Sequence, residues 1–198
     1  MLGITEREQG THTQQSEIFW GELAPCDHVL QLYESDDEFL SMLEGYVADG
    51  LQSGDGVVVI STTQHAKDLN SRLRARGINV LAERRSRKLI LMNAEQTLQS
   101  FVDDDGWPND DKFYEVIGTI LRRARGKDQR RVRAFGEMVA VLWGRGQNAA
   151  TVRLEYLWQR LCRDQEFRLF CAYPKAGFTD YALKSLQDIC AAHSRVIQ

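Results

Sequence analysis

One carboxylate in this sequence stands in apolar surroundings. Glu137 follows Phe135 and precedes Met138 and Val139. A carboxylate in such a place is partly desolvated, so it must find a partner or become protonated. Glu137 can therefore orient a polar group of a bound molecule. The alternative is a carboxylate at the end of a strand that is bonded to a backbone amide or to an arginine.

Two tyrosines and two histidines extend this candidate set. Tyr33 and Tyr173 come at the ends of apolar segments, where their rings can form the walls of a ligand pocket, or simply pack with their hydroxyls at water. His28 begins the first of these segments. His193 lies on the apolar side of the last expected helix. The alternative interpretation is a core histidine whose hydrogen bonds are made with neighbouring residues.

Signatures of catalysis and of cofactor binding are missing from the sequence. The glycine-rich stretch 50–56 precedes an apolar segment and has no lysine, so it is not a phosphate-binding loop. There is no GxGxxG after the first apolar segment, no GxSxG and no HExxH. The four cysteines form no CxxC pair. We therefore expect no enzyme, no metal site and no cofactor.

Composition is that of one globular domain. The 198 residues are 43% hydrophobic and 27% charged, with a net charge of −3. No apolar run approaches the ~18–20 residues that a membrane span needs, and the N-terminus lacks the features of a signal peptide. These observations predict a cytoplasmic protein that does not bind membranes.

Residues 1–17 are polar and aperiodic and are predicted to be a flexible tail, followed by a domain over residues 18–198. Strands are expected at 29–33, 57–60, 89–92, 131–135 and 167–173. The alternation at 131–135 indicates a strand with one face less covered. Helical patterns separate the strands, with Ser35, Asn93 and Asn148 as caps and Gly126 as a terminator.

Strands separated by helices of this length form right-handed crossovers and a parallel sheet. The expected fold is therefore α/β, with three layers: a mainly parallel five-stranded sheet with helices on both faces. Because ligands bind at the carboxyl ends of such strands, the candidate crevice lies among the residues that leave them. These residues are Tyr33 and Glu34, Ser61 and Thr62, Asn93, Gly136 and Glu137, and Tyr173.

A basic stretch at 122–133 could bind phosphate groups or an acidic partner. It has no interleaved aromatic residues and belongs to no helix-turn-helix. The favoured interpretation is a solvated helix end whose cations interact favourably with the helix dipole. Nucleic acid is not an expected partner.

A series of short motifs runs along the sequence: Trp20-Gly21, His28 to Glu34, Gly50-Leu51, Phe135 to Val139, Leu142-Trp143, Phe170 to Pro174 and Ile189 to Ser194. Taken in order, these motifs resemble the MEDS family, the sensory domains named for methanogens, methylotrophs and the dichloromethane-responsive repressor. The resemblance covers about residues 18–197. Six residues separate Gly21 from His28, where relatives often run tryptophan, glycine and histidine almost together.

This resemblance implies a RecA/KaiC-like domain without a phosphate loop that senses a simple hydrocarbon derivative. It further implies a signalling partner, either a histidine kinase or a transcription regulator, and is compatible with a homo-oligomer. Because the sequence ends soon after His193, we expect an excised sensor or a stand-alone member of the family. The residues carried over as ligand-binding are His28, Tyr33, Glu137, Tyr173 and His193.

Two other functions remain open at this point. A degenerate nucleotide-binding domain would hold its ligand through arginines such as Arg133. A protein-interaction domain would need no ligand, and tight core packing of Tyr33 and Tyr173 would favour it.

Overall fold

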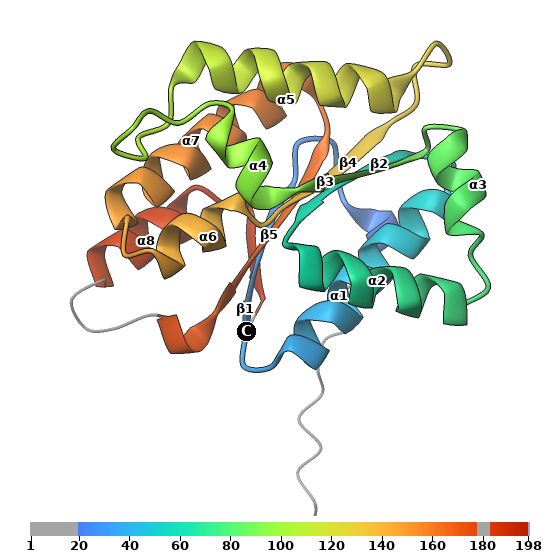
Figure 1. Ribbon diagram of the computed structural model, residues 1–198, viewed down its shortest axis with the longest axis horizontal. Helices are drawn as coiled ribbons and strands as arrows, with labels where there is room; N and C mark the ends of the chain where they lie inside the picture. Colours follow the sequence, from blue (N-terminus) through green and yellow to red (C-terminus); the bar gives the residue numbers. More distant parts are fainter. Residues whose placement is uncertain (1–19, 178–182, 198) are drawn as a thin grey trace, which may run out of the picture.

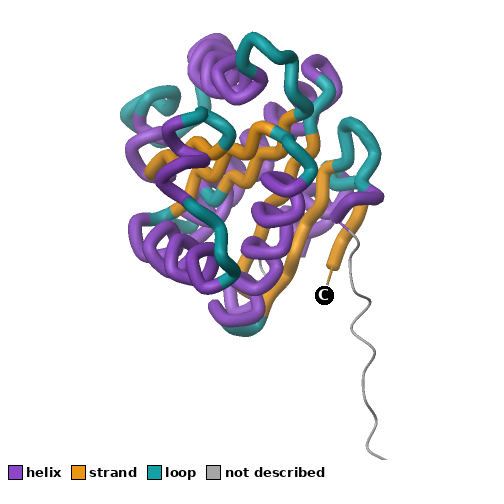
Figure 2. Tube along the Cα trace, turned by 90° about the vertical axis from the view of Figure 1, so that its right-hand side faces the viewer, coloured by secondary structure: helices purple, strands orange, loops and turns teal. Residues whose placement is uncertain are grey.

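The computed structural model describes residues 20–177 and 183–197, and the predicted tail over 1–17 lies outside them. A parallel sheet forms the middle of three layers, with helices on both of its faces (Figure 1). The view turned by 90° shows the sheet as a twisted central ribbon between those helices (Figure 2). The predicted α/β class and its layers are confirmed.

The sheet has six strands in the order β3-β2-β4-β5-β1-β6, and every pair is parallel. Five had been predicted. The sixth strand, β6, has only three residues, and it pairs with β1 through its backbone. Its side chains therefore form no pattern from which the strand could be predicted. The strands are β1 (His28–Tyr33), β2 (Gly56–Ser61), β3 (Leu89–Asn93), β4 (Val132–Gly136), β5 (Arg168–Pro174) and β6 (Arg195–Ile197).

Helices divide between the two faces of the sheet. One face, called here the α1 face, packs against η1 (Trp20–Glu22), α1 (Asp36–Gln52), α2 (Thr63–Ala75) and α3 (Val80–Arg85). The opposite face, the α7 face, packs against α4 (Ala94–Gln99), α5 (Asp110–Arg125), α6 (Met138–Gly144), α7 (Asn148–Gln165) and α8 (Leu183–Ala191). A second 3-10 turn, η2 (Lys175–Gly177), follows β5.

The predicted helix boundaries hold where a side chain or a glycine marks them. Ser35 and Asn93 accept hydrogen bonds from the amides three residues later, and Gly126 ends α5. Asn148, in contrast, is not the cap of α7, because Gln147 occupies that position. The short helices α3 and α6 have too few residues to show a periodic apolar stripe, and the sequence did not predict them.

Glycines in the stretch 50–56 serve packing between elements. A Cβ on Gly56 would lie 2.3 Å from the carbonyl oxygen of Ala124, so only glycine lets β2 approach α5 this closely. A Cβ on Gly50 would lie 2.9 Å from both Arg133 and Val57. The local glycine content therefore reflects the contact of α1 and α5 with the sheet.

β4 is buried along its whole length, which corrects the prediction that one of its faces is less covered. The cause is Arg133, whose charged side chain is enclosed in the α1 face at 1% exposure. Its guanidinium donates to Asp55 at 2.7 Å and contacts Asp49 at 2.6 Å. Ion pairing thus lets an arginine occupy a position that the alternating pattern assigned to solvent.

Among residues 20–177 and 183–197, no helix combines the length and the apolar character that crossing a membrane requires.

Replacing Arg133 by Met should lower the free energy of unfolding by about 3 kcal/mol, because the buried Asp55 loses its closest cation. Arg131 provides the control: it also contacts Asp55, but it is 63% exposed, so Arg131→Met should cost less than about 1 kcal/mol. Urea unfolding of both variants measures the difference. Equal losses in the two variants would contradict the importance assigned to the buried pair.

Candidate functional site

The five residues predicted to bind a ligand fall into two separate groups. Tyr33 and Glu137 lie at the carboxyl edge, on the side of the sheet that faces α1 and α2. His28, Tyr173 and His193 lie on the α7 face. The separation follows from the alternation of side chains along β1 and β5, which sends successive residues to opposite faces.

Glu137 joins the ends of β2 and β4. One of its carboxylate oxygens accepts a hydrogen bond from the backbone amide of Thr62 at 2.7 Å, and the other accepts one from Nδ1 of His65 at 2.6 Å. The bond to a backbone amide is the alternative that the sequence left open for this residue. Connections leave β2 towards the α1 face and β4 towards the α7 face, so Glu137 bridges a switch point of the sheet.

His65 was not predicted as a site residue, although it lies in the first turn of α2, where its amide donates to the side chain of the Thr62 cap. The hydrogen bond with Glu137 raises the pKa of His65, and the negative charges of Glu137 and Asp36 act in the same direction, against the lowering effect of burial. The Nε2 atom of His65 lies 3.9 Å from Asp36. His65 therefore links two acidic residues from different segments.

Tyr33 is packed in the core rather than standing as an open aromatic wall. It is 7% exposed, and its ring stacks on Phe39 with the centroids 5.0 Å apart. Burial raises the pKa of its phenol, and the charge of Glu137 raises it further. The tyrosine hydroxyl consequently stays protonated at neutral pH.

A second cluster is enclosed on the α7 face. His28 opens β1, Cys171 lies within β5, Glu155 projects from α7, and His193 follows α8. One ligand-type atom from each of these residues lies within 4.8 Å of the others. The side chains of Glu155 and His193 are both fully buried. Tyr173 adds a hydrogen bond from its hydroxyl to Glu155 at 2.5 Å.

Burial sets the electrostatics of this cluster. It raises the pKa of Glu155, and the nearby His193 and the hydrogen bonds from Tyr173 and Cys171 only partly oppose that rise. It lowers the pKa of His28 well below 6.5, with His193 adding to the effect, so the His28 imidazole is neutral. Burial likewise raises the pKa values of Cys171 and Tyr173, and the charge of Glu155 acts in the same direction.

Two of these cluster residues, Glu155 and Cys171, were not predicted as site residues. Glu155 is adjacent to Leu154 in α7, and the apolar pattern of this helix gave no sign that a carboxylate would be buried with the apolar residues. Cys171 has period-two spacing with Tyr173, which indicates a shared face of β5. That spacing was the one signal in the sequence that placed Cys171 beside a predicted site residue.

A pocket of about 450 Å³ lies at the carboxyl ends of β2 and β3. Ser61 and Asn93, both among the predicted strand-end residues, line it together with residues of α2 and α3. The hydroxyl oxygen of Ser61 is buried and has no hydrogen-bond partner among the described residues. The other lining residues are Thr63, Ala66, Lys67, Asn70, Arg74, Val80, Leu81, Arg84, Leu91 and Met92.

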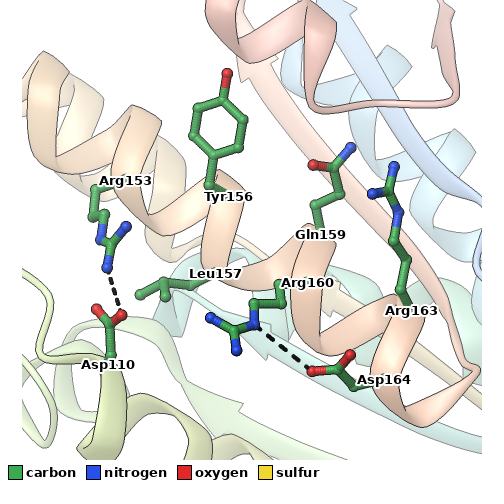
Figure 3. Close-up of a pocket in the computed structure, with 8 residues that line it drawn as sticks. All are labelled: Asp110, Arg153, Tyr156, Leu157, Gln159, Arg160, Arg163 and Asp164. Atoms are coloured by element: carbon green, nitrogen blue, oxygen red, sulfur yellow. Dashed lines mark hydrogen bonds and ion pairs between the residues drawn. The ribbon is translucent and has the colours of Figure 1, made fainter.

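Two further hollows lie among the helices that cover the α7 face. One of about 610 Å³ lies between α4 and α5. The other, of about 520 Å³, lies along α7, where Figure 3 shows Arg153 pointing to Asp110 and Arg160 to Asp164. Arg153 and Arg160 are already paired with carboxylates, so the hollow along α7 offers fewer free polar groups to a ligand.

Arg133 cannot serve the nucleotide-binding alternative as the sequence suggested. Its guanidinium is buried in the α1 face and is paired with Asp49 and Asp55. The phosphate groups of a nucleotide could reach it only by displacing these carboxylates.

A family sequence model described as "MEthanogen/methylotroph, DcmR Sensory domain" (MEDS) matches residues 27–194. No curated protein matches the chain significantly. Among solved structures, the chain is similar to the KaiC-like protein PH0186 from the hyperthermophilic archaeon Pyrococcus horikoshii OT3. The TM-score is 0.58 at 11% identity, and the alignment covers 87% of this chain and 71% of that one. At this identity the likeness shows a shared RecA/KaiC-type fold.

Replacing Glu137 by Gln should lower the pKa of His65 towards 6.5, because the charged imidazolium loses its principal partner. A histidine whose pKa is raised by folding stabilises the protein at pH values below its pKa in the unfolded state. This stabilisation disappears as the pH rises through the raised pKa of the folded state. The stability lost in Glu137→Gln should therefore be largest below pH 6.5 and should shrink at higher pH.

NMR titration of His65 and urea unfolding across this pH range measure both effects. Glu34→Gln is the control, since Glu34 is an exposed carboxylate whose partner is Lys175. A His65 pKa that is the same in the wild type and in Glu137→Gln would disprove the coupling.

Proposed function

The chain belongs to the MEDS family of sensory domains, and we propose that it is a non-enzymatic, cytoplasmic sensor of a simple, partly apolar organic molecule. Binding would change its conformation, and a histidine kinase or transcription regulator would read that change. All four cysteines are free thiols, which supports a reducing compartment.

The observation that carries this proposal is the pocket at the ends of β2 and β3. Its volume of about 450 Å³ suits a small organic molecule. Val80, Leu91 and Met92 supply apolar surface, while Asn93 and the unpartnered hydroxyl of Ser61 can orient one polar group. Apolar walls combined with polar groups that orient the bound molecule are typical of ligand sites. Lys67, Arg74 and Arg84 add positive charge to the lining of this pocket.

The same pocket is connected, through helix α2, to the hydrogen bonds that Glu137 accepts from Thr62 and His65. Helix α2 forms one wall through Ala66 and Asn70, and the first turn of this helix is held by Glu137 through Thr62 and His65. A ligand that favours a different position of α2 would alter these two hydrogen bonds. The change would then pass to β4 and α6, where Glu137 is placed between the two elements.

The geometry of the Glu137–His65 pair also supports the proposal of a non-enzymatic sensor. A histidine that activates a nucleophile needs a hydroxyl or a thiol near its second nitrogen. In this chain, Nε2 of His65 faces the carboxylate of Asp36 at 3.9 Å. A positioning role for the pair fits this geometry better than acid–base chemistry.

A screen of small alcohols, amines, halogenated hydrocarbons and aromatics by thermal shift and calorimetry should find a ligand. Ala66→Leu should weaken its binding by about tenfold or more, because the added side chain fills the pocket. Ala75→Leu makes the same substitution at an exposed position of α2 outside the pocket, and should leave the affinity unchanged.

If no compound in the screen binds, the sensor proposal is wrong. If Ala66→Leu and Ala75→Leu bind the ligand equally well, the ligand site is not this pocket. Labelled nucleotides belong in the same screen, and submicromolar affinity for them would favour the degenerate nucleotide-binding domain.

A protein-interaction domain is the second candidate function. The packing of Tyr33 on Phe39 and the complete burial of Tyr173 favour it, since neither ring is left open to a ligand. A chain that retains no small molecule or nucleotide in the screen would support this candidate.

A further inference from the structure

Four side chains with metal-binding atoms converge on the α7 face, away from the proposed ligand pocket. His28, Glu155, Cys171 and His193 come from β1, α7, β5 and the segment after α8, so chain folding alone brings them together. Two of their buried atoms, Oε2 of Glu155 and Nε2 of His193, have no hydrogen-bond partner among the described residues. Unpartnered polar atoms in a dry core are costly unless something else binds them.

Three of the distances between the donor atoms are close to the edges of a metal-centred tetrahedron, and all of the donor atoms lie within 4.8 Å of one another. With metal–ligand distances of about 2.0–2.3 Å, neighbouring nitrogen and oxygen ligands lie about 3.3 Å apart, and nitrogen and sulfur ligands about 3.6 Å apart. Here Nε2 of His28 lies 3.4 Å from both Sγ of Cys171 and Oε2 of Glu155, and Nε2 of His193 lies 3.6 Å from the same oxygen.

Neighbouring groups orient these ligands. Nδ1–H of His28 donates to the carbonyl oxygen of Ala192 at 3.0 Å, and Nδ1–H of His193 donates to that of Ile189 at 2.6 Å. A carbonyl can only accept, so each ring carries a proton on Nδ1, and Nε2 is the nitrogen that faces the cluster and can bind a metal. The hydroxyl of Tyr173 holds the other oxygen of Glu155, which leaves Oε2 facing both histidines.

We propose that His28, Glu155, Cys171 and His193 form a tetrahedral site for a divalent transition-metal ion such as Zn²⁺. Two imidazoles, a thiolate and a carboxylate favour zinc over magnesium or calcium, which require more oxygen ligands. Binding removes the thiol proton of Cys171 and any proton on Glu155, and these protons pass to the buffer. Because four protein ligands fill the coordination shell, the site is structural rather than catalytic.

The bound ion fixes the end of the described chain to the sheet. His193 directly precedes Ser194, whose amide donates to the carbonyl of His28, and β6 then pairs with β1. Metal binding therefore ties α8 and β6 to β1 and β5. The site lies on the opposite face of the sheet from the pocket wall formed by α2, so it does not depend on the proposed sensory ligand.

The test uses the full chain after treatment with a strong chelator. Titration with Zn²⁺ should show one equivalent bound, with release of protons and a higher melting temperature, whereas Mg²⁺ should have no such effect. Co²⁺ should give the intense visible bands of a tetrahedral site, together with a thiolate-to-cobalt charge-transfer band. Amide exchange in β6 should slow when Zn²⁺ is added.

Cys171→Ala should abolish the charge-transfer band and weaken Zn²⁺ binding by about 100-fold or more. Cys162→Ala is the matched control, because Cys162 is also buried in this core but its thiol donates to the carbonyl of Phe167. If Cys171→Ala does not fold, Glu155→Gln provides the second variant: it keeps the shape of the side chain, and it should also weaken binding, with circular dichroism confirming its fold.

A wild-type chain that binds no Zn²⁺ would overturn the proposal. So would a Cys171→Ala variant with the affinity and cobalt spectrum of the wild type, or a cobalt spectrum without a thiolate band. The ligand screen tests a pocket on a different face of the sheet and uses a different variant, Ala66→Leu. Failure of either experiment therefore leaves the other proposal intact.

Discussion

The structure depends on one constraint: a charged side chain that is buried on, or next to, a strand covered on both faces must meet a partner inside the protein. β1, β2 and β4 are buried at every position. An unpaired charge there would cost several kcal/mol, of about the same size as the net stability of a domain. Arg133 meets this constraint through Asp55, and Glu137 meets it through Thr62 and His65.

The same constraint makes the two clusters different in kind. Glu137 lies where the strands end, so its partners come from a helix terminus next to a pocket, and a ligand can influence them. His28 and Cys171 lie on the sheet beneath α7, and Glu155 reaches them from that helix; none of the three is more than 2% exposed. A cluster of that kind can be completed only by protons or by a metal ion, whereas the strand-end cluster can respond to a molecule from outside.

Much of the fold could be predicted because its signals are local. Apolar runs give the strands, Ser35 and Asn93 mark helix starts, and alternating helices and strands imply parallel crossovers. β6 and α6 were missed because they are too short to show a period. The site was predicted only in part, since period-two spacing assigns residues to a face but does not say which strands are neighbours.

His65 and Glu155 illustrate that limit. Nothing in the sequence near His65 indicates that the residue after β4 will reach it, because this contact spans 72 positions of the chain. Glu155 looks like one more charge on an amphipathic helix until β1 and β5 are placed beneath it. Both residues acquire a role only from contacts between elements that are far apart in sequence.

The carboxyl edge also explains why a KaiC-like fold need not imply phosphate binding. In α/β domains, phosphate groups bind at helix N-termini, where free amides and the helix dipole attract anions. In this chain, the protein's own carboxylates already occupy two such positions: Glu137 accepts the amide of Thr62 ahead of α2, and Asp36, Asp37 and Glu38 fill the first turn of α1. A phosphate at either helix would meet negative charge. The starts of α1 and α2 are therefore poor phosphate sites, which agrees with a sensor of small organic compounds.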